Sequence, residues 1–130
     1  MRTIKFRGCS CGEWCYGNLY IRKHEEFGDC AYIIGFTQNP STTTIVDINT
    51  IGQFTGLRDK NGREIYEGDI IKSSYGTIHY IVYDNDLACF KAVVARYNPS
   101  NEYSNLSKGW IACLNQEVIG NVHDNLELLK

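Results

Sequence analysis

The chain has 130 residues and a formal net charge of −2, and neither half of it is markedly basic. Proteins that bind a nucleic-acid duplex usually present a basic face that displaces counterions from phosphate, and the short set Arg2, Lys5 and Arg7 does not make one. No run of about 20 apolar residues is present, so a membrane-spanning helix is excluded. The N-terminus lacks the apolar centre of a signal peptide, and we expect a cytoplasmic protein without structural disulfides.

The first third of the chain is predicted to form extended segments. Nine tyrosines and a single methionine favour strands, where aromatic side chains pack on a pleated surface. Ile4 and Phe6 alternate with polar residues, and Gly8 is expected to end this first strand. Trp14 and Tyr16 share one face of the second. The predicted strands cover residues 4–7, 14–21, 32–36 and 44–46, and a polar loop at 37–43 precedes the last of them.

Residues 59–62, Asp-Lys-Asn-Gly, have the chemistry of a hairpin turn. Asp can accept hydrogen bonds from the backbone ahead of it, Asn tolerates a left-handed conformation, and Gly takes positive φ without a Cβ clash. The Glu-Gly-Asp step at residues 67–69 precedes an Ile-Ile pair. In small barrels such a step often turns the chain just before a strand. We therefore expect a hairpin at 59–62 and a new strand beginning after Gly68.

The remainder of the chain alternates again. Residues 78, 80 and 82 are apolar on one face of a strand, and His79 lies on the other with Thr77 and Ile81. Asp124 or Asn125 is expected to cap one helical turn over residues 126–129. The other predicted features are a turn at 85–86, an extended segment at 89–97, a polar loop at 98–108, an apolar segment at 110–114 and a last strand at 117–122.

The expected fold class is therefore mainly β, or α+β at most. We expect antiparallel strands and one or two short helical turns, because no segment sustains an apolar stripe of helical period over three turns. At this length the chain is expected to be one domain, residues 1–130. Within it, residues 1–48 would make an N-terminal β subdomain and residues 49–130 a second part.

Several segments together resemble the YopX family. They are residues 4–8 (Ile-Lys-Phe-Arg-Gly), Trp14 with Tyr16 and Gly17, the block 50–71, and the segments 117–121 and 127–129. The resemblance implies a β-rich phage or prophage protein of bacteria that tends to self-associate, and it implies no known reaction, ligand or cofactor. It also implies a small barrel-like C-terminal part, which would cover residues 49–130. The motif residues that we expect to shape the backbone are Gly52, Gln53, Gly56, Asp59, Asn61, Gly62, Tyr66, Glu67, Gly68 and Asp69.

The chain also departs from the family pattern. Leu126 stands where the family commonly has Pro, and Cys15 stands where it commonly has an aliphatic residue. Cys9 and Cys11 fill a segment that varies within the family. The cysteines near the N-terminus therefore do not follow from the family signature.

Four of these thiols, Cys9, Cys11, Cys15 and Cys30, could form a zinc site. Zinc takes four thiolate or imidazole ligands, usually in pairs spaced C-x₂₋₄-C. Cys11 and Cys15 approach that spacing, whereas Cys9 and Cys11 do not, and a second matching pair is missing. The alternative, which we favour, is a set of small packed or partly exposed thiols. Cys89 and Cys113 are expected to pack in apolar strands.

No pattern in the sequence enforces a catalytic arrangement. A nucleophile needs a base within reach, and none of the six cysteines lies in a motif that pairs it with His24, His79 or His123. His79 and His123 are expected to be satisfied polar side chains, and the segment after His24 lacks the second histidine of a zinc-protease helix. Four carboxylates crowd the central hairpin, but a calcium loop needs Gly at its sixth position and Gly62 is only fourth from Asp59. We expect a solvated turn with local ion pairs there.

The leading hypothesis is a non-enzymatic interaction module that assembles with copies of itself or with a phage or host protein. An alternative is a small barrel that binds single-stranded nucleic acid by stacking bases on exposed aromatic residues. The third hypothesis is a thiol- or zinc-dependent enzyme, and no cofactor is expected. The candidate stacking residues are Tyr16, Tyr20, Tyr80, Tyr97 and Trp110.

Overall fold

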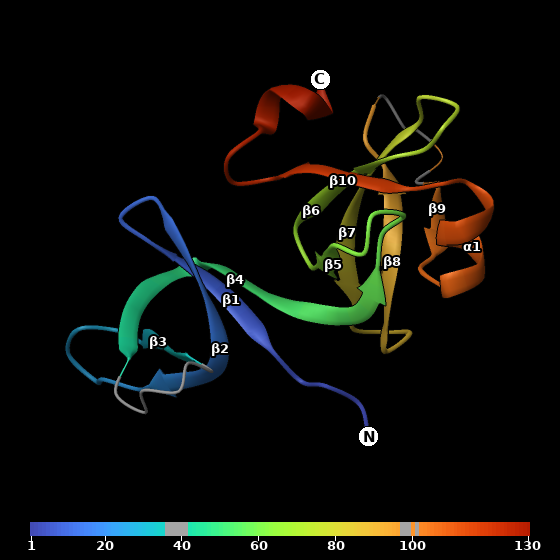
Figure 1. Ribbon diagram of the computed structural model, residues 1–130. Coiled ribbons are helices and arrows are strands. Elements are labelled where there is room, and N and C mark those ends of the chain that lie inside the picture. Colours follow the sequence, from blue (N-terminus) through green and yellow to red (C-terminus); the bar gives the residue numbers. More distant parts are fainter. Residues whose placement is uncertain (36–41, 97–99, 101) are drawn as a thin grey trace. The chain divides into compact units, whose positions relative to one another are not determined.

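The computed structural model describes residues 1–35, 42–96, 100 and 102–130, and it divides into two compact units. Unit 1 comprises Met1–Phe54 and unit 2 comprises Thr55–Lys130 (Figure 1). The described residues form ten strands, one short α-helix and one 3₁₀ helix, and all strand pairings are antiparallel. The predicted mainly β class is confirmed. Most of the loop expected at 37–43, and Tyr97, lie outside the described residues.

Unit 1 is a ring of four strands. Strand β1 pairs with β2, β2 with β3, β3 with β4, and β4 again with β1. Each of the four strands therefore has a partner on both sides. The strands are β1 (Phe6–Ser10), β2 (Glu13–Arg22), β3 (Cys30–Gly35) and β4 (Thr43–Arg58), the last of which continues into unit 2.

The expectation that Gly8 ends the first strand is wrong. Gly8 lies inside β1, paired with Cys15, and is buried. A Cβ atom at this position would lie 2.6 Å from Cγ2 of Val46, so the glycine permits two strands of a small ring to approach closely. A glycine that terminates a strand and one that permits close packing look alike in sequence.

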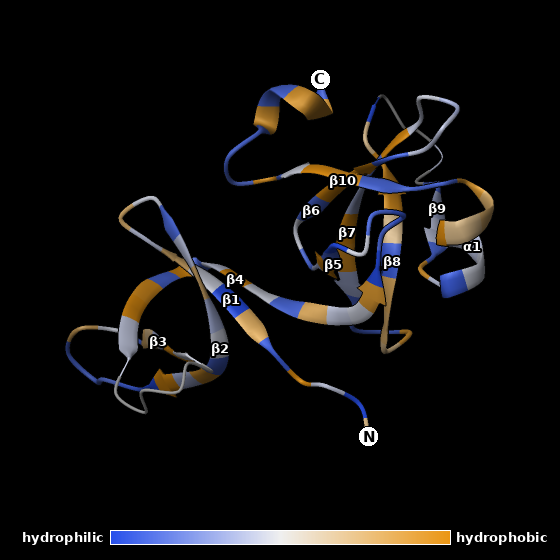
Figure 2. Cartoon of the chain, viewed as in Figure 1, coloured by the Kyte–Doolittle hydropathy of each residue, from blue (hydrophilic) through white to orange (hydrophobic). Residues whose placement is uncertain are grey.

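Strand β4 is longer than the predicted segment 44–46. It runs for 16 residues and its pairing with β1 shifts register between Arg7 and Cys9. Polar residues at this irregularity bond locally: the Thr50 hydroxyl donates to the Asp47 carbonyl at 2.6 Å, and the Asn49 N–H donates to the Asp47 carboxylate at 3.0 Å. These polar residues interrupt the alternation on which the sequence prediction relied. Figure 2 shows apolar and polar residues alternating along β4.

The core of unit 1 fills the inside of the ring. Its fully buried members are Ala31, Ile33 and Val46, which come from β3 and β4. The residues packed around them include Phe6, Cys15, Leu19, Ile21 and Ile51. Alternate residues of each strand therefore point inward, and the others form the outer face.

Unit 2 contains a five-stranded sheet in the order β10-β6-β7-β8-β9. Within the described residues, the outer strands β9 and β10 are not paired with each other. None of the helices in this part of the chain is long and apolar enough to cross a membrane. The elements are β5 (Glu64–Tyr66), β6 (Asp69–Lys72), β7 (Ile78–Asp84), β8 (Cys89–Val94), β9 (Tyr103–Asn105), α1 (Lys108–Cys113), β10 (Glu117–Asn121) and the 3₁₀ helix η1 (Leu126–Leu129).

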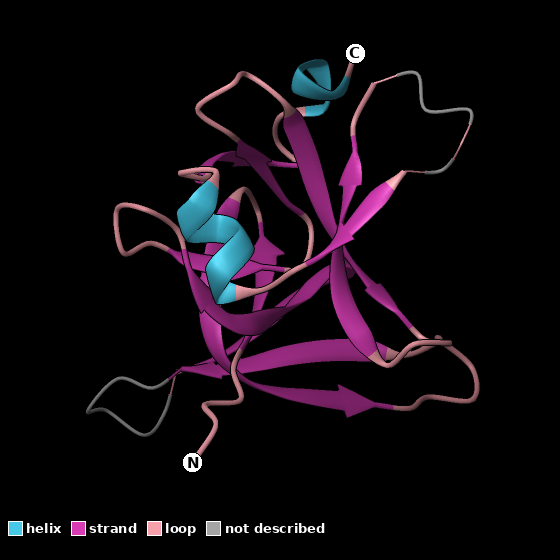
Figure 3. Cartoon of the chain, turned by 90° about the vertical axis from the view of Figure 1, so that its right-hand side faces the viewer, coloured by secondary structure: helices cyan, strands magenta, loops and turns pink. Residues whose placement is uncertain are grey.

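The core of unit 2 is built from residues of the sheet, of β5 and of α1, and Figure 3 shows this helix lying beside the strands. Its buried members are Ile65, Ile71, Ile81, Ala92, Ile111 and Val118. The predicted faces of β7 are confirmed, since His79 and Ile81 are buried and Tyr80 is half-buried. The helical turn predicted over residues 126–129 is confirmed as η1. The expected side-chain cap is not formed, since Asn125 precedes the helix without a capping hydrogen bond and its Oδ1 accepts from the Asn121 N–H instead.

Two features of unit 2 differ from the sequence expectation. The apolar segment at 110–114 belongs mostly to α1, so Cys113 is an exposed helix residue and does not pack in a strand. The helix begins after Ser107, whose hydroxyl accepts a hydrogen bond from the N–H of Trp110 at 3.2 Å. Six residues are too few to show helical periodicity. Strand β9 falls within the expected polar loop at 98–108 and has only three residues.

Candidate interaction surface

The outer face of unit 1 presents large aromatic side chains to solvent. Along β2, Tyr16, Asn18, Tyr20 and Arg22 are exposed, whereas the residues between them are buried or half-buried. Tyr16 is 45% exposed and Tyr20 54% exposed. Because side chains alternate along a strand, these four residues point to the same side, away from the core.

Strand pairing extends this face across three strands. Tyr20 is opposite Tyr32 of β3, and Tyr32 is opposite Ile45 of β4. The rings of Tyr20 and Tyr32 have their centroids 6.2 Å apart with planes inclined at 39°. Ile45 is 55% exposed. We name the set Tyr16, Tyr20, Tyr32 and Ile45 the tyrosine face.

A buried arginine lies beside this face. The guanidinium carbon of Arg7 lies 4.7 Å from the centroid of the Trp14 ring, and Arg7 is paired with Tyr16 across β1 and β2. A cation held over an aromatic ring contributes about 0.5–2 kcal/mol, more when it is desolvated. This contact fixes Trp14 and supports the end of the tyrosine face nearest Tyr16.

The tyrosine face suits contact with a protein better than contact with a polyanion. Tyrosine is enriched in protein interfaces, and its ring offers a large contact area with few torsions to order. The charges of unit 1 balance: its cations are Arg2, Lys5, Arg7, Arg22 and Lys23, and its carboxylates are Glu13, Glu25, Glu26, Asp29 and Asp47.

The structure brings together only part of the predicted stacking set. Tyr16 and Tyr20 lie on one face of β2, but Tyr80 and Trp110 belong to unit 2. Tyr80 is half-buried, and Trp110 packs against the core with its ring edge-on to His79 at 5.2 Å. Sequence reasoning missed Tyr32 and Ile45. The signal was present, since each alternates with a buried apolar neighbour.

The comparisons with known proteins place the chain in a family. A family model described as YopX protein matches residues 5–130. The chain belongs to the YopX family. It is also similar to the crystal structure of protein EF1440 from Enterococcus faecalis, with 26% identity, full coverage of both chains and a TM-score of 0.63. No curated protein matches the chain.

The YopX-like central segment builds turns in unit 2. The Asp59 carboxylate accepts hydrogen bonds from the N–H groups of Asn61 and Arg63 through Oδ1 and of Val118 through Oδ2, each at 2.9 Å. Gly62 closes the predicted turn by donating its N–H to the Asp59 carbonyl at 3.0 Å, with φ +81°. This confirms the hairpin turn.

A second aspartate organises the Glu-Gly-Asp step. Asp69 Oδ2 accepts a hydrogen bond from the Tyr66 N–H at 2.7 Å, and Gly68 has φ +91°. Asp59 and Asp69 are only 7% and 1% exposed, so the expected solvated turn is wrong for these two carboxylates. Buried carboxylates need hydrogen-bond donors, and the backbone of the turns supplies them. Glu64 remains in a surface ion pair with Arg58, at 3.7 Å.

The four N-terminal thiols take different environments. Cys15 packs towards the core of unit 1, whereas Cys9, opposite Trp14, points to the other side of the ring. Cys11 is exposed at φ +49°, and Cys30 begins β3 half-buried. Within the described ranges no three His, Cys, Asp or Glu side chains are placed to hold a metal ion, and all six thiols are free.

His79 differs from the expected satisfied histidine. It is buried beneath Trp110, and its Nδ1 atom has no hydrogen-bond partner in the described part of the chain. Burial lowers the pKa of the His79 imidazole below its ordinary value, because the charged form is the more costly to desolvate. The neutral imidazole is therefore the form that fits the folded core.

Proposed function

We propose that this chain is a non-enzymatic protein-interaction module that binds a second copy of itself through the tyrosine face. The observation that carries the proposal is the row Tyr20–Tyr32–Ile45 across three paired strands, in which Tyr20 and Ile45 are exposed and Tyr32 between them is half-buried. The phage or prophage setting, implied by the family resemblance, and the bacterial cytoplasm, expected from the N-terminal sequence, belong to the same proposal.

The ring of unit 1 favours binding by side chains. All four of its strands are paired on both sides, so a partner cannot add a strand to an open edge of the ring. Backbone pairing also holds the four side chains of the tyrosine face in a fixed arrangement. A pre-arranged face loses little conformational entropy on binding.

Charge balance supports a second copy as the partner. Two identical faces that carried a net charge would repel each other, whereas the formal charges of unit 1 cancel. In a two-fold contact the same patch serves both subunits, so Tyr20 and Ile45 of each copy would meet apolar surface of the other.

Light scattering coupled to size-exclusion chromatography tests this proposal. We expect a mass above that of the 14.8 kDa monomer for the natural chain at high micromolar concentration, and a monomer for the double variant Tyr20→Ser, Ile45→Ser. The control is Tyr75→Ser, which removes an exposed tyrosine of unit 2. A monomeric natural chain, or a double variant that still associates, would contradict the proposal.

Binding of single-stranded nucleic acid is the second candidate. Tyr16 and Tyr20 are exposed on the same strand, and Arg22 follows on the same side. Fluorescence anisotropy with a labelled oligonucleotide at low and moderate salt tests this candidate. Binding that weakens with salt and with Tyr20→Ser would support it, and the absence of binding would reject it.

A further inference from the structure

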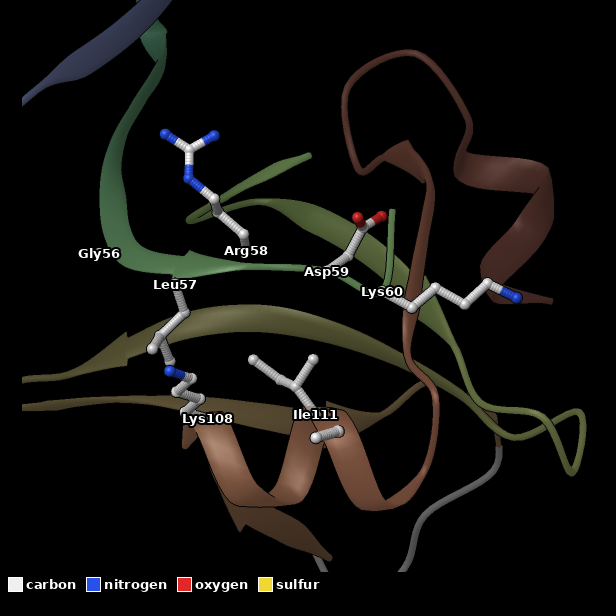
Figure 4. A pocket seen from close by; sticks show the side chains of 8 residues that line it. Gly56, Leu57, Arg58, Asp59, Lys60, Lys108 and Ile111 are labelled. Carbon is white, nitrogen blue, oxygen red and sulfur yellow. The ribbon is translucent and has the colours of Figure 1, made fainter. Parts of the chain in front are cut away.

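A pocket of about 400 Å³ lies in unit 2 between the end of β4 and helix α1 (Figure 4). The strand side contributes residues 56–60, and the helix contributes Lys108, Ile111 and Ala112. Pockets that hold small molecules commonly measure about 300 to 1,000 Å³. Its size therefore suits a small ligand.

The middle of this pocket is apolar. The side chain of Leu57 points from β4 towards the helix, and that of Ile111 points from α1 towards the strand (Figure 4). Ala112 adds a small methyl group beside Ile111. Leu57 is half-buried and Ala112 exposed, whereas Ile111 is only 4% exposed, so Leu57 and Ala112 offer most of the apolar surface to a ligand.

Three of the four charged side chains around the pocket are already engaged. Asp59 uses its carboxylate on three backbone N–H groups. Arg58 points to the side of β4 opposite Leu57 and donates to the Gly62 carbonyl at 3.0 Å (Figure 4). Lys60 is paired with Glu117 at 3.5 Å.

Lys108 is the exception. Its ammonium group lies beside Leu57 at the border of the apolar surface (Figure 4), and it has no ion pair or hydrogen bond within the residues that the structure describes. An ammonium next to an apolar surface is suited to a carboxylate attached to an apolar body. The pocket therefore combines a cation with space for an apolar group.

Gln116 joins the two walls of the pocket. Its carbonyl accepts a hydrogen bond from the Lys60 N–H at 3.0 Å, and its N–H donates to the Ile111 carbonyl at 3.1 Å. Its side chain is fully buried, and neither the amide oxygen nor the amide nitrogen has a partner within the described ranges. Buried amides normally bond to protein or to ordered water, but the Gln116 side chain does not line the pocket, so only its backbone takes part in holding the two walls.

We propose that this pocket binds a small apolar acid, with one carboxylate on an aliphatic or aromatic body. The body lies against Leu57, Ile111 and Ala112, and the carboxylate meets the ammonium of Lys108. This inference concerns unit 2 and stands independently of the self-association proposed for unit 1.

Methyl NMR with octanoate as the probe tests the site, and 1-octanol is the matched neutral compound. We expect octanoate to shift the methyl signals of Leu57, Ile111 and Ala112 most strongly. Octanol should bind about threefold more weakly at low salt, because it lacks the charge that Lys108 would meet. Shifts spread evenly over the apolar residues of both units, or equal affinity for the two compounds, would overturn the proposal.

Two variants distinguish the contribution of the Lys108 charge to binding from that of the apolar surface. Lys108→Gln should weaken octanoate about threefold and leave octanol unchanged, whereas the control Lys72→Gln, an exposed lysine outside the pocket, should change neither. Ala112→Trp should fill the pocket and abolish binding of both. Circular dichroism checks that each variant is folded. Full octanoate binding by folded Ala112→Trp, or by Lys108→Gln at low salt, would reject the site.

Discussion

The carboxylate of Asp59 accepts a hydrogen bond from the N–H of Val118, 59 residues further along the chain, at 2.9 Å. The other oxygen of the same carboxylate holds two N–H groups of its own turn. One side chain thus closes the hairpin and ties it to β10. It also occupies a backbone donor that β10 does not use in its pairing with β6.

Asp59→Ala should therefore destabilise the protein strongly. Three backbone donors, of which that of Val118 is buried and the other two are partly buried, would lose a charged acceptor, and we expect the free energy of unfolding to fall by about 2–4 kcal/mol. Urea denaturation followed by tryptophan fluorescence measures the change. The exposed carboxylate of Asp86 provides the control: Asp86→Ala should change the stability by less than about 0.5 kcal/mol. Equal effects of the two substitutions would contradict this role.

Gly17→Ala tests the close packing of the strand ring. A Cβ atom at Gly17 would lie 2.0 Å from the carbonyl oxygen of Ile34, which is backbone and cannot rotate away. We expect a loss of about 3 kcal/mol or more in urea denaturation. Gly109 of α1 has open space around its Cβ position, so Gly109→Ala should stabilise the protein by up to about 1 kcal/mol. A tolerated alanine at residue 17 would show that the strands do not approach as described.

His79 makes the stability of the protein depend on pH. Because the folded state holds the His79 pKa below its ordinary value of 6.5, the unfolded chain binds the proton more readily. Stability should then be greatest above pH 6.5 and fall as the pH drops through that value towards the lowered pKa. The urea midpoint, measured across this range, should depend less on pH in His79→Phe than in the natural chain. In the control His24→Gln its dependence on pH should be unchanged. If the urea midpoint of His79→Phe depended on pH as strongly as that of the natural chain, a group other than His79 would cause the dependence.

The ion pair of Asp84 and Lys91 lowers the pKa of the Asp84 carboxyl. Lys91 Nζ lies 2.9 Å from Asp84 Oδ2, and this hydrogen bond is the main cause that lowers the pKa of Asp84, with the Leu87 N–H next. Lys91→Met should raise the Asp84 pKa towards its ordinary value, as followed by carboxyl NMR. Because the pair lies near solvent, its effect on stability should be small. An Asp84 pKa that does not move would mean that the backbone N–H donors dominate.

Local chemistry made much of the fold predictable. The hairpin at 59–62, the Gly68–Asp69 turn and the alternation of side chains along β7 each depend on residues close together in sequence. The contacts that the sequence did not predict join residues that are far apart along the chain. The contact of Asp59 with Val118 and the packing of Gly8 against Val46 come from the assembled unit, and no local pattern encodes them.

The tyrosine face was only half predictable for the same reason. Tyr16 and Tyr20 share a strand, so alternation alone places them together. Tyr32 and Ile45 join them through the register of β2, β3 and β4, which a single sequence does not reveal. The register converts scattered aromatic residues into one surface.

The concentration dependence of methyl NMR spectra tests the proposed self-association most directly. Spectra recorded from micromolar to submillimolar protein should show the Ile45 methyl signals moving with concentration, because this side chain is exposed on the tyrosine face. The signals of Ile81, buried in unit 2, should stay fixed. Ile45 signals that do not change over this range would contradict a contact between copies through the tyrosine face.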